Sequence, residues 1–152
     1  MTRNSDVSSP DLAPHELSPS DAPAAERLRL AGLRPTRQRL VLANLLFTGE
    51  DRHTTAEQLH ADVLSAGEHV SLATVYNTLH QFRRAGLVRE LAIEGSKAYF
   101  DTNTSNHNHF LIEQTGELMD ISGTAIDVSG LPEPPEGMKI THIDVVVRLA
   151  PK

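Results

Sequence analysis

The chain contains no cysteine and no tryptophan, and aromatic side chains make up only 4% of its 152 residues. Without cysteine, it can form neither disulfides nor zinc sites built from thiolates. The shortage of aromatic side chains argues against stacking platforms for single-stranded nucleic acid. No apolar run approaches the roughly 20 residues needed to cross a bilayer, and no signal peptide precedes the first predicted helix. We therefore expect a cytoplasmic protein with no membrane partner.

Charge is distributed unevenly along the chain, although the net charge is −6. Residues 1–23 carry one basic and four acidic residues, residues 24–100 carry ten and eight, and residues 101–152 carry three and eight. The first part is also rich in Ser, Pro, Asp and Ala without an apolar period, which predicts a disordered tail. A mildly basic middle followed by an acidic third predicts two modules with different partners, divided at 24–100 and 101–152.

The middle part begins with the apolar spacing of helices. Three predicted helices run from Ala24 to about Ala31, from Pro35-Thr36 to near Gly49, and from Thr54 or Thr55 to Gly67. The fourth is the clearest, in SLATVYNTLHQFRRAG, where Ser71 can cap the start and Gly86 follows the end. Its apolar stripe consists of Leu72, Val75, Leu79 and Phe82.

Two short strands, LVRELA and KAYF, follow these helices and are joined at residues 94–96 as a predicted hairpin. Helices followed by such a ribbon make a winged helix-turn-helix, in which the last helix enters the major groove of DNA. After Asp101 the pattern changes to strands, in NHFLIE, GELMDI and KITHIDVVVRL, where Ile143, Val145 and Val147 alternate on one face. We predict an α+β chain: an N-terminal winged helix-turn-helix DNA-binding domain, then a small α/β dimerisation domain that completes its core in a homodimer.

The fourth helix offers side chains suited to reading double-stranded DNA. Thr74, Tyr76 and Asn77 lie off its apolar stripe and can contact base edges, while arginines can neutralise phosphates. The candidate phosphate contacts are Arg34, Arg37 and Arg84. A polar helix face used for protein contact is the alternative, but the local basic charge favours DNA.

The stretch YFDTNTSNHNHF places an acid before two histidines that share one strand face, His107 and His109. Asp101 and Asp120 bring carboxylates from neighbouring segments, and His53 can approach from the start of the third helix. Nitrogen and oxygen ligands in this ratio suit Fe²⁺, Mn²⁺, Co²⁺ or Zn²⁺ rather than Ca²⁺ or Mg²⁺. An isolated H-x-H usually belongs to an exposed polar loop. Here the acid-His-His-acid series at the junction of the two modules favours a metal site instead.

A second, weaker pair is Asp127 with His142, which lies among apolar neighbours in the last predicted strand. A half-buried histidine satisfied by hydrogen bonds explains His142 at least as well as a ligand role.

These motifs resemble the ferric uptake regulator superfamily. GLRPTRQR, HTTAEQLHADV, SLATVYNTLHQFRRAGLV and HNHF occur in the family's order, and the resemblance runs from about Leu30 to Leu149. Within the family, LPEPPEGMKITHIDVVVRL and the missing cysteines are similar to the iron response regulator branch of the alpha-proteobacteria. That branch comprises dimeric transcriptional regulators of iron and haem metabolism.

The resemblance implies a regulatory metal site at the domain hinge, formed by His53, Asp101, His107, His109 and Asp120. Aspartate at both carboxylate positions is the pattern of the peroxide-sensing branch. Members of that branch bind Fe²⁺ or Mn²⁺ and release DNA when iron-catalysed oxidation attacks a ligand histidine. Peroxide sensing is therefore the rival to haem or iron sensing.

The chain departs from the family pattern at several positions. Ile112 and Thr115 stand in place of the first C-x-x-C pair, so the structural zinc site is absent. Asn106 and Asn108 replace a histidine and an acid of the second metal site, and leave Asp127 and His142. Without a Cys-Pro motif, any haem needs histidine ligands, most simply His107 and His109. Asn77 stands where many members carry arginine, which predicts a different operator.

The leading hypothesis is a repressor of iron and haem homeostasis genes. In this hypothesis a divalent ion (Fe²⁺, Mn²⁺ or Zn²⁺) or haem controls binding to an inverted-repeat operator. The alternative is a peroxide-sensing, metal-dependent repressor of oxidative-stress genes. A metalloenzyme with an open Fe²⁺ site is a third hypothesis, but it leaves the helix-turn-helix unexplained, and we expect no enzymatic activity.

Overall fold

The computed structural model describes residues 18–93 and 97–152, and these divide into two compact units between Asn103 and Thr104. The expected tail therefore lies mostly outside the described residues, as does the expected hairpin turn at 94–96. The expected boundary stood between residues 100 and 101. Asp101 belongs to the first unit because it lies on a strand of that unit's sheet.

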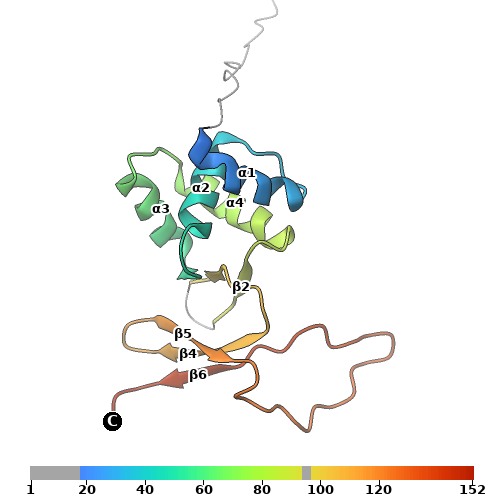
Figure 1. Cartoon of the computed structure of the whole chain (residues 1–152). Coiled ribbons are helices and arrows are strands. Elements are labelled where there is room, and N and C mark those ends of the chain that lie inside the picture. The colour runs from blue at the N-terminus through green and yellow to red at the C-terminus, as the bar shows by residue number, and fades with distance from the viewer. Residues whose placement is uncertain (1–17, 94–96) are drawn as a thin grey trace, which may run out of the picture. The chain divides into compact units, whose positions relative to one another are not determined.

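The described residues of the first unit form four α-helices (Figure 1): α1 (Ala22–Leu30), α2 (Arg37–Phe47), α3 (Ala56–Ser65) and α4 (Leu72–Arg84). A short 3-10 turn, η1 (Pro19–Asp21), precedes them, so helical structure starts within the expected tail. Thr36, Thr55 and Ser71 cap α2, α3 and α4 through their side-chain oxygens. At α3, Thr55 and Gln58 form a reciprocal capping box. The sequence signals for these helix starts are confirmed.

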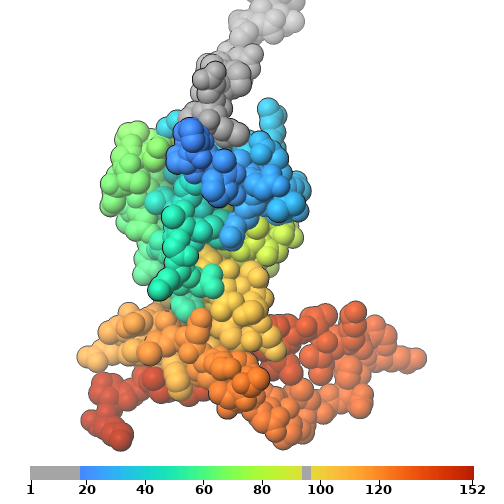
Figure 2. All heavy atoms as spheres, viewed as in Figure 1, coloured from blue at the N-terminus to red at the C-terminus, as the bar shows by residue number. Residues whose placement is uncertain are grey.

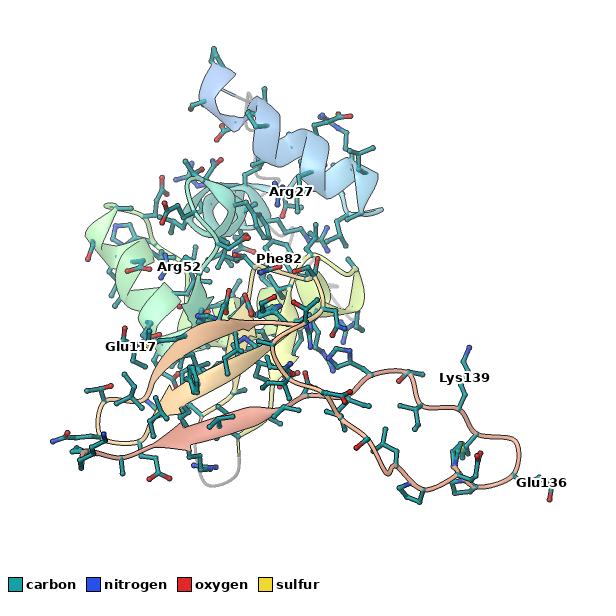
Figure 3. All side chains as sticks on the ribbon, turned by 60° about the horizontal axis from the view of Figure 1, so that its bottom comes forward. Arg27, Arg52, Phe82, Glu117, Glu136 and Lys139 are labelled. Atoms are coloured by element: carbon teal, nitrogen blue, oxygen red, sulfur yellow. The ribbon has the colours of Figure 1, made fainter. Side chains whose placement is uncertain are left out.

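The helices enclose one hydrophobic core. Its fully buried side chains come from all four helices and include Leu28, Leu42, Leu46, Leu59, Val63, Val75, Leu79 and Phe82. Three of the four predicted α4 stripe residues belong to it, whereas Leu72 is 36% exposed. Figure 3 shows Phe82 directed into the interior from α4. This packing fixes which face of α4 remains outside.

A three-stranded sheet completes the first unit, with the order β1-β3-β2. Its strands are β1 (His53–Thr54), β2 (Arg89–Leu91) and β3 (Tyr99–Asp101), and both pairings are antiparallel. β2 and β3 are the predicted wing strands. β1 was not predicted, because two residues are too few to show a periodic pattern.

The second unit is a three-stranded sheet with the order β5-β4-β6. Its strands are β4 (His107–Ile112), β5 (Glu117–Ser122) and β6 (Val146–Leu149); β4 pairs antiparallel with β5 and parallel with β6. The last strand is shorter than predicted, and no helix occurs within residues 104–152. In Figures 1 and 2, the connection from β5 to β6 extends far from the sheet as an irregular loop, on which Glu136 and Lys139 point outward (Figure 3).

No helix within the described ranges is both long and apolar enough to span a bilayer.

Candidate metal-binding and DNA-reading sites

The first unit brings together two of the five predicted metal ligands. His53 and Asp101 are paired residues of the antiparallel strands β1 and β3, and their side chains lie on the same face of that sheet. The His53 Nε2 atom lies 3.2 Å from an Asp101 carboxylate oxygen. An imidazole and a carboxylate at this separation can ligate one divalent ion after a small adjustment.

Hydrogen bonds around this pair fix its backbone. The Arg52 amide donates to the Thr102 hydroxyl over 2.8 Å, and the Thr102 amide donates to the Arg52 carbonyl over 3.1 Å. The Asn103 amide donates to Asp101 Oδ1 over 2.9 Å, which orients the carboxylate. Orientation of a ligand by its neighbours is typical of protein metal sites.

The second unit brings together the other three predicted ligands. His107 and His109 lie on one face of β4, and His109 pairs with Asp120 of β5. Both histidine Nε2 atoms lie 3.4 Å from Asp120 Oδ1, and the two rings are 4.5 Å apart between centroids. This convergence follows from the period of two along β4 and from the register with β5.

The ring of His107 is oriented by a backbone contact. Its Nδ1 atom lies 2.7 Å from the Ser105 carbonyl oxygen. A carbonyl only accepts hydrogen bonds, so Nδ1 is the protonated nitrogen when the ring is neutral. Nε2, which faces Asp120, is then the nitrogen suited to ligate a metal.

The second predicted site is not assembled in the same way. His142 Nε2 lies 2.8 Å from Asp144 Oδ1, and no cluster of three or more potential ligands in the described ranges includes Asp127 or His142. Asn108, at a family ligand position, instead accepts a hydrogen bond from the Val145 amide over 3.3 Å. A metal site at Asp127 and His142 stays a prediction.

The predicted DNA-reading residues of α4 differ in exposure. Asn77 and Arg84 are exposed, whereas Thr74 and Tyr76 are half-buried on the flanks of the helix. Thr74 belongs to the helix start, since its hydroxyl accepts from the Ser71 hydroxyl over 2.9 Å. Asn77 is therefore the predicted base-reading side chain that projects furthest from the core.

The predicted phosphate contacts on α2 and before it occupy the surface. Arg34 and Arg37 are both exposed, and Arg37 forms a 2.7 Å ion pair with Glu68. An exposed ion pair contributes little to stability and can be exchanged for a phosphate.

Sequence reasoning missed a contact that holds one flank of α4. The Arg39 guanidinium donates through two nitrogens to Gln81 Oε1, over 3.1 and 3.0 Å, and through a third to the Arg34 carbonyl, over 2.9 Å. This fork ties the start of α2 to α4. Arg39 and Gln81 are 42 positions apart in the sequence, so only the tertiary structure shows that they meet.

The other flank of α4 is held by a second missed residue, Glu57 of α3. The Tyr76 hydroxyl donates to Glu57 Oε1 over 2.7 Å. This bond lowers the pKa of Glu57, because it favours the carboxylate, and raises the pKa of Tyr76, because ionisation would break it. Glu57 lies two positions after the Thr55 cap, where an acidic residue is common in any helix, so its sequence position does not indicate a contact with α4.

With this geometry established, comparison with known proteins gives the family. The model of the "Ferric uptake regulator family" matches residues 30–148. The chain belongs to the ferric uptake regulator family. Its members are dimeric, metal-responsive DNA-binding regulators of transcription and not enzymes. The predicted family and fold class are confirmed, and the metalloenzyme hypothesis is set aside.

Relatives in two branches of the family resemble the chain. It is 38% identical over 101 residues to the ferric uptake regulation protein of Pseudomonas aeruginosa, covering 66% of this chain and 75% of that protein. It is 34% identical over 129 residues to the peroxide-responsive repressor PerR of Staphylococcus epidermidis, covering 84% of this chain and 83% of that protein.

Among solved structures, the ferric uptake regulator of P. aeruginosa with manganese superposes with a TM-score of 0.66 at 31% identity, covering 85% of this chain and 98% of that one. These similarities establish the family and leave the branch undecided.

Proposed function

We propose that this protein is a metal-gated transcriptional repressor of iron and haem homeostasis genes. The observation that carries the proposal is the pair of half-sites, His53 with Asp101 in one unit and His107, His109 with Asp120 in the other. Each half-site alone offers too few ligands for a closed transition-metal site, and together they offer five.

Chain connectivity supports a single shared ion. Asp101 ends β3 and His107 begins β4, so only five residues separate them. An extended chain spans about 3.6 Å per residue, which keeps their Cα atoms within about 22 Å in any arrangement of the units. A tether this short gives the second half-site a high effective concentration around an ion held by the first.

The ligands favour particular ions. Three imidazole nitrogens and two carboxylates would hold Fe²⁺, Mn²⁺ or Zn²⁺, since Ca²⁺ and Mg²⁺ prefer oxygen ligands only. Ion binding by all five residues would restrict the DNA-binding unit relative to the sheet, and so favour one geometry over others.

A homodimer would turn this restriction into operator binding. In a dimer with two-fold symmetry, each protomer presents one α4, and both helices reach successive major grooves only at one separation. We therefore propose an inverted-repeat operator, read by Asn77 and Tyr76 and bound at phosphates by Arg34, Arg37 and Arg84.

The sheet of the second unit offers a face for dimerisation. Strand alternation puts the His107 and His109 ligands on one face and Phe110, Met119 and Val147 on the other. Met119 is 48% exposed, and Phe110 and Val147 are partly exposed. An apolar face of this kind is typical of a homodimer interface.

Peroxide sensing is the second candidate. The two proposed carboxylate ligands are Asp101 and Asp120, and aspartate at both positions is the pattern of the peroxide-sensing branch. A peroxide-responsive repressor is also similar to this chain over most of its length. In that function, oxidation of His53 or His107 in iron-loaded protein would release the operator. Haem ligation by His107 and His109 stays a prediction for the first candidate.

The deciding experiment is a mobility shift on Mn²⁺- and Fe²⁺-loaded protein with an inverted-repeat, AT-rich operator, titrated with haem and with peroxide. Release by near-stoichiometric haem without covalent change would support haem and iron regulation. Release by peroxide alone, with oxygen added to His53 or His107 by mass spectrometry, would support peroxide sensing. No metal-dependent DNA binding in any condition would overturn both.

A further inference from the structure

Tyr76 is a predicted base-reading residue whose polar group already has a partner on another helix. Its hydroxyl donates to Glu57 of α3 over 2.7 Å, while its ring packs against the edge of the helical core. α3 and α4 lie next to each other in the first unit (Figure 1). The ring is therefore held at two points, by the core and by the carboxylate.

Glu57 is well placed to keep accepting this hydrogen bond. It occupies the first turn of α3, where backbone amides and the helix dipole favour negative charge. Lys97, just before β3, brings its ammonium to 4.0 Å from the same carboxylate oxygen. These groups favour the ionised form of Glu57, which can only accept.

A hydroxyl that donates to Glu57 has no second hydrogen to offer to a base. A tyrosine held in this way can present to the major groove its apolar ring and a hydroxyl oxygen that only accepts. The apolar feature of the major groove is the C5-methyl group of thymine, and the other base edges there present donors and acceptors. Asn77, the exposed neighbour, retains both its donor and its acceptor for direct readout.

We propose that Glu57 is a positioning residue for operator specificity: by holding the Tyr76 hydroxyl, it makes Tyr76 select a thymine methyl group in each half-site. The inference rests on the proposed DNA-binding function and adds a residue that does not itself contact DNA. A carboxylate that merely joined α3 to α4 would affect stability and overall affinity, but not the choice of base at one position.

The test begins with operators selected from random duplex DNA by the Mn²⁺-loaded full chain. Each thymine of the selected operator is then replaced by deoxyuridine, which removes only the methyl group. We expect one thymine per half-site at which the wild-type protein binds about fourfold more weakly after replacement, the loss expected for one buried methyl group. In Glu57→Ala the loss at that thymine should shrink below about twofold, because the ring keeps its packing against the core but loses the hydrogen bond that fixes its position.

Three further variants complete the design. Glu57→Gln keeps an oxygen that can accept from Tyr76, and should restore the wild-type sensitivity. Tyr76→Phe keeps the ring but loses the hydroxyl, and should show the same reduced methyl sensitivity as Glu57→Ala. It tests the inference independently if Glu57→Ala folds poorly. Glu90→Ala is the matched control, because it removes a carboxylate that pairs with a different residue of α4, Arg83, at 3.3 Å. It should leave the methyl sensitivity unchanged.

The outcomes separate the inference from the function on which it rests. If Glu57→Ala and Tyr76→Phe keep the full sensitivity at the same thymine, or if no thymine is methyl-sensitive in the wild-type protein, Glu57 has no role in specificity. If the wild-type protein selects no sequence at all, the proposed DNA-binding function itself fails.

Discussion

His53 and Asp101 face each other across two antiparallel strands, with 3.2 Å between the imidazole Nε2 atom and a carboxylate oxygen. One strand, β1, precedes α3 and the other, β3, is the second strand of the wing, so the fold of the DNA-binding unit is needed to bring the two residues together. Binding of an ion by this pair would therefore depend on the folding of the unit. The second unit carries the other three predicted ligands, His107, His109 and Asp120, on a single strand pair, β4 with β5.

Removal of His53 should uncouple the two half-sites. In His53→Ala, we expect Mn²⁺ affinity to fall more than about 100-fold, since loss of even an outer-shell partner commonly costs 10–100-fold. Metal-dependent operator binding should be lost at the same time. Competition with a fluorescent chelator measures the affinity, and a mobility shift measures the DNA binding.

His69→Ala is the matched control, because His69 is an exposed histidine of the same unit that belongs to no ligand cluster in the described ranges. It should bind Mn²⁺ like the wild-type protein. Equal affinities in His53→Ala and His69→Ala would show that His53 is not a ligand.

The Glu57–Tyr76 hydrogen bond gives a pH dependence with a defined sign. The pKa of Glu57 lies below its ordinary value of 4.5, so its contribution to folding is complete above that pH and is lost as the pH falls through the lowered value. The pKa of Tyr76 lies above its ordinary value of 10.0, so its contribution is complete below that pH and is lost as the pH rises through the raised value.

The stability difference between wild-type protein and Tyr76→Phe should therefore be constant from about pH 5 to about pH 9 and shrink on both sides. Urea unfolding at a series of pH values measures it. A difference that stays constant into the acid range would show that the ionised Glu57 carboxylate does not stabilise the fold through Tyr76.

The sequence predicted the helices well because their signals are local. Thr36, Thr55 and Ser71 are caps that bond within the first turn of their own helices, and the α4 stripe repeats with the helical period. The shared face of His107 and His109 was also predictable, because alternation along a strand needs no knowledge of tertiary structure.

The features that the sequence did not predict depend on contacts between distant segments. β1 has only two residues and exists because β3 pairs with it. Residues before Val146 were expected to continue the last strand, but the ladder with β4 starts near Val145. The Arg39–Gln81 fork and the Glu57–Tyr76 bond join different helices, and no local pattern marks such pairs.

The apolar face of the second sheet predicts a variant that dissociates the dimer. Met119→Lys replaces a side chain that is 48% exposed in the protomer, so the protomer should still fold. Burial of an unpaired ammonium in the interface costs several kcal/mol, and the dimer dissociation constant should rise by at least about 100-fold. Analytical ultracentrifugation measures the constant, and circular dichroism checks the fold.

Gln114→Lys supplies the control for Met119→Lys. It adds the same charge in the turn between β4 and β5, where residue 114 is exposed and lies off the sheet faces. This variant should remain dimeric. If both variants dimerise equally well, the interface lies elsewhere on the chain.

Phe82 joins α4 to the rest of the helical core. Its side chain is fully buried, and its ring lies 6.0 Å from the ring of Phe47 on α2, in a tilted arrangement. Phe82→Ala leaves a cavity in the core. The helices cannot easily close it, because polar contacts hold both flanks of α4 in place. We expect the free energy of unfolding of the first unit to fall by about 3–5 kcal/mol, measured by urea denaturation.

Arg84→Ala is the control for Phe82→Ala. It changes an exposed side chain at the end of the same helix, and should lower the free energy of unfolding by less than about 0.5 kcal/mol. Similar losses in both variants would mean that Phe82 does not pack in the core as described.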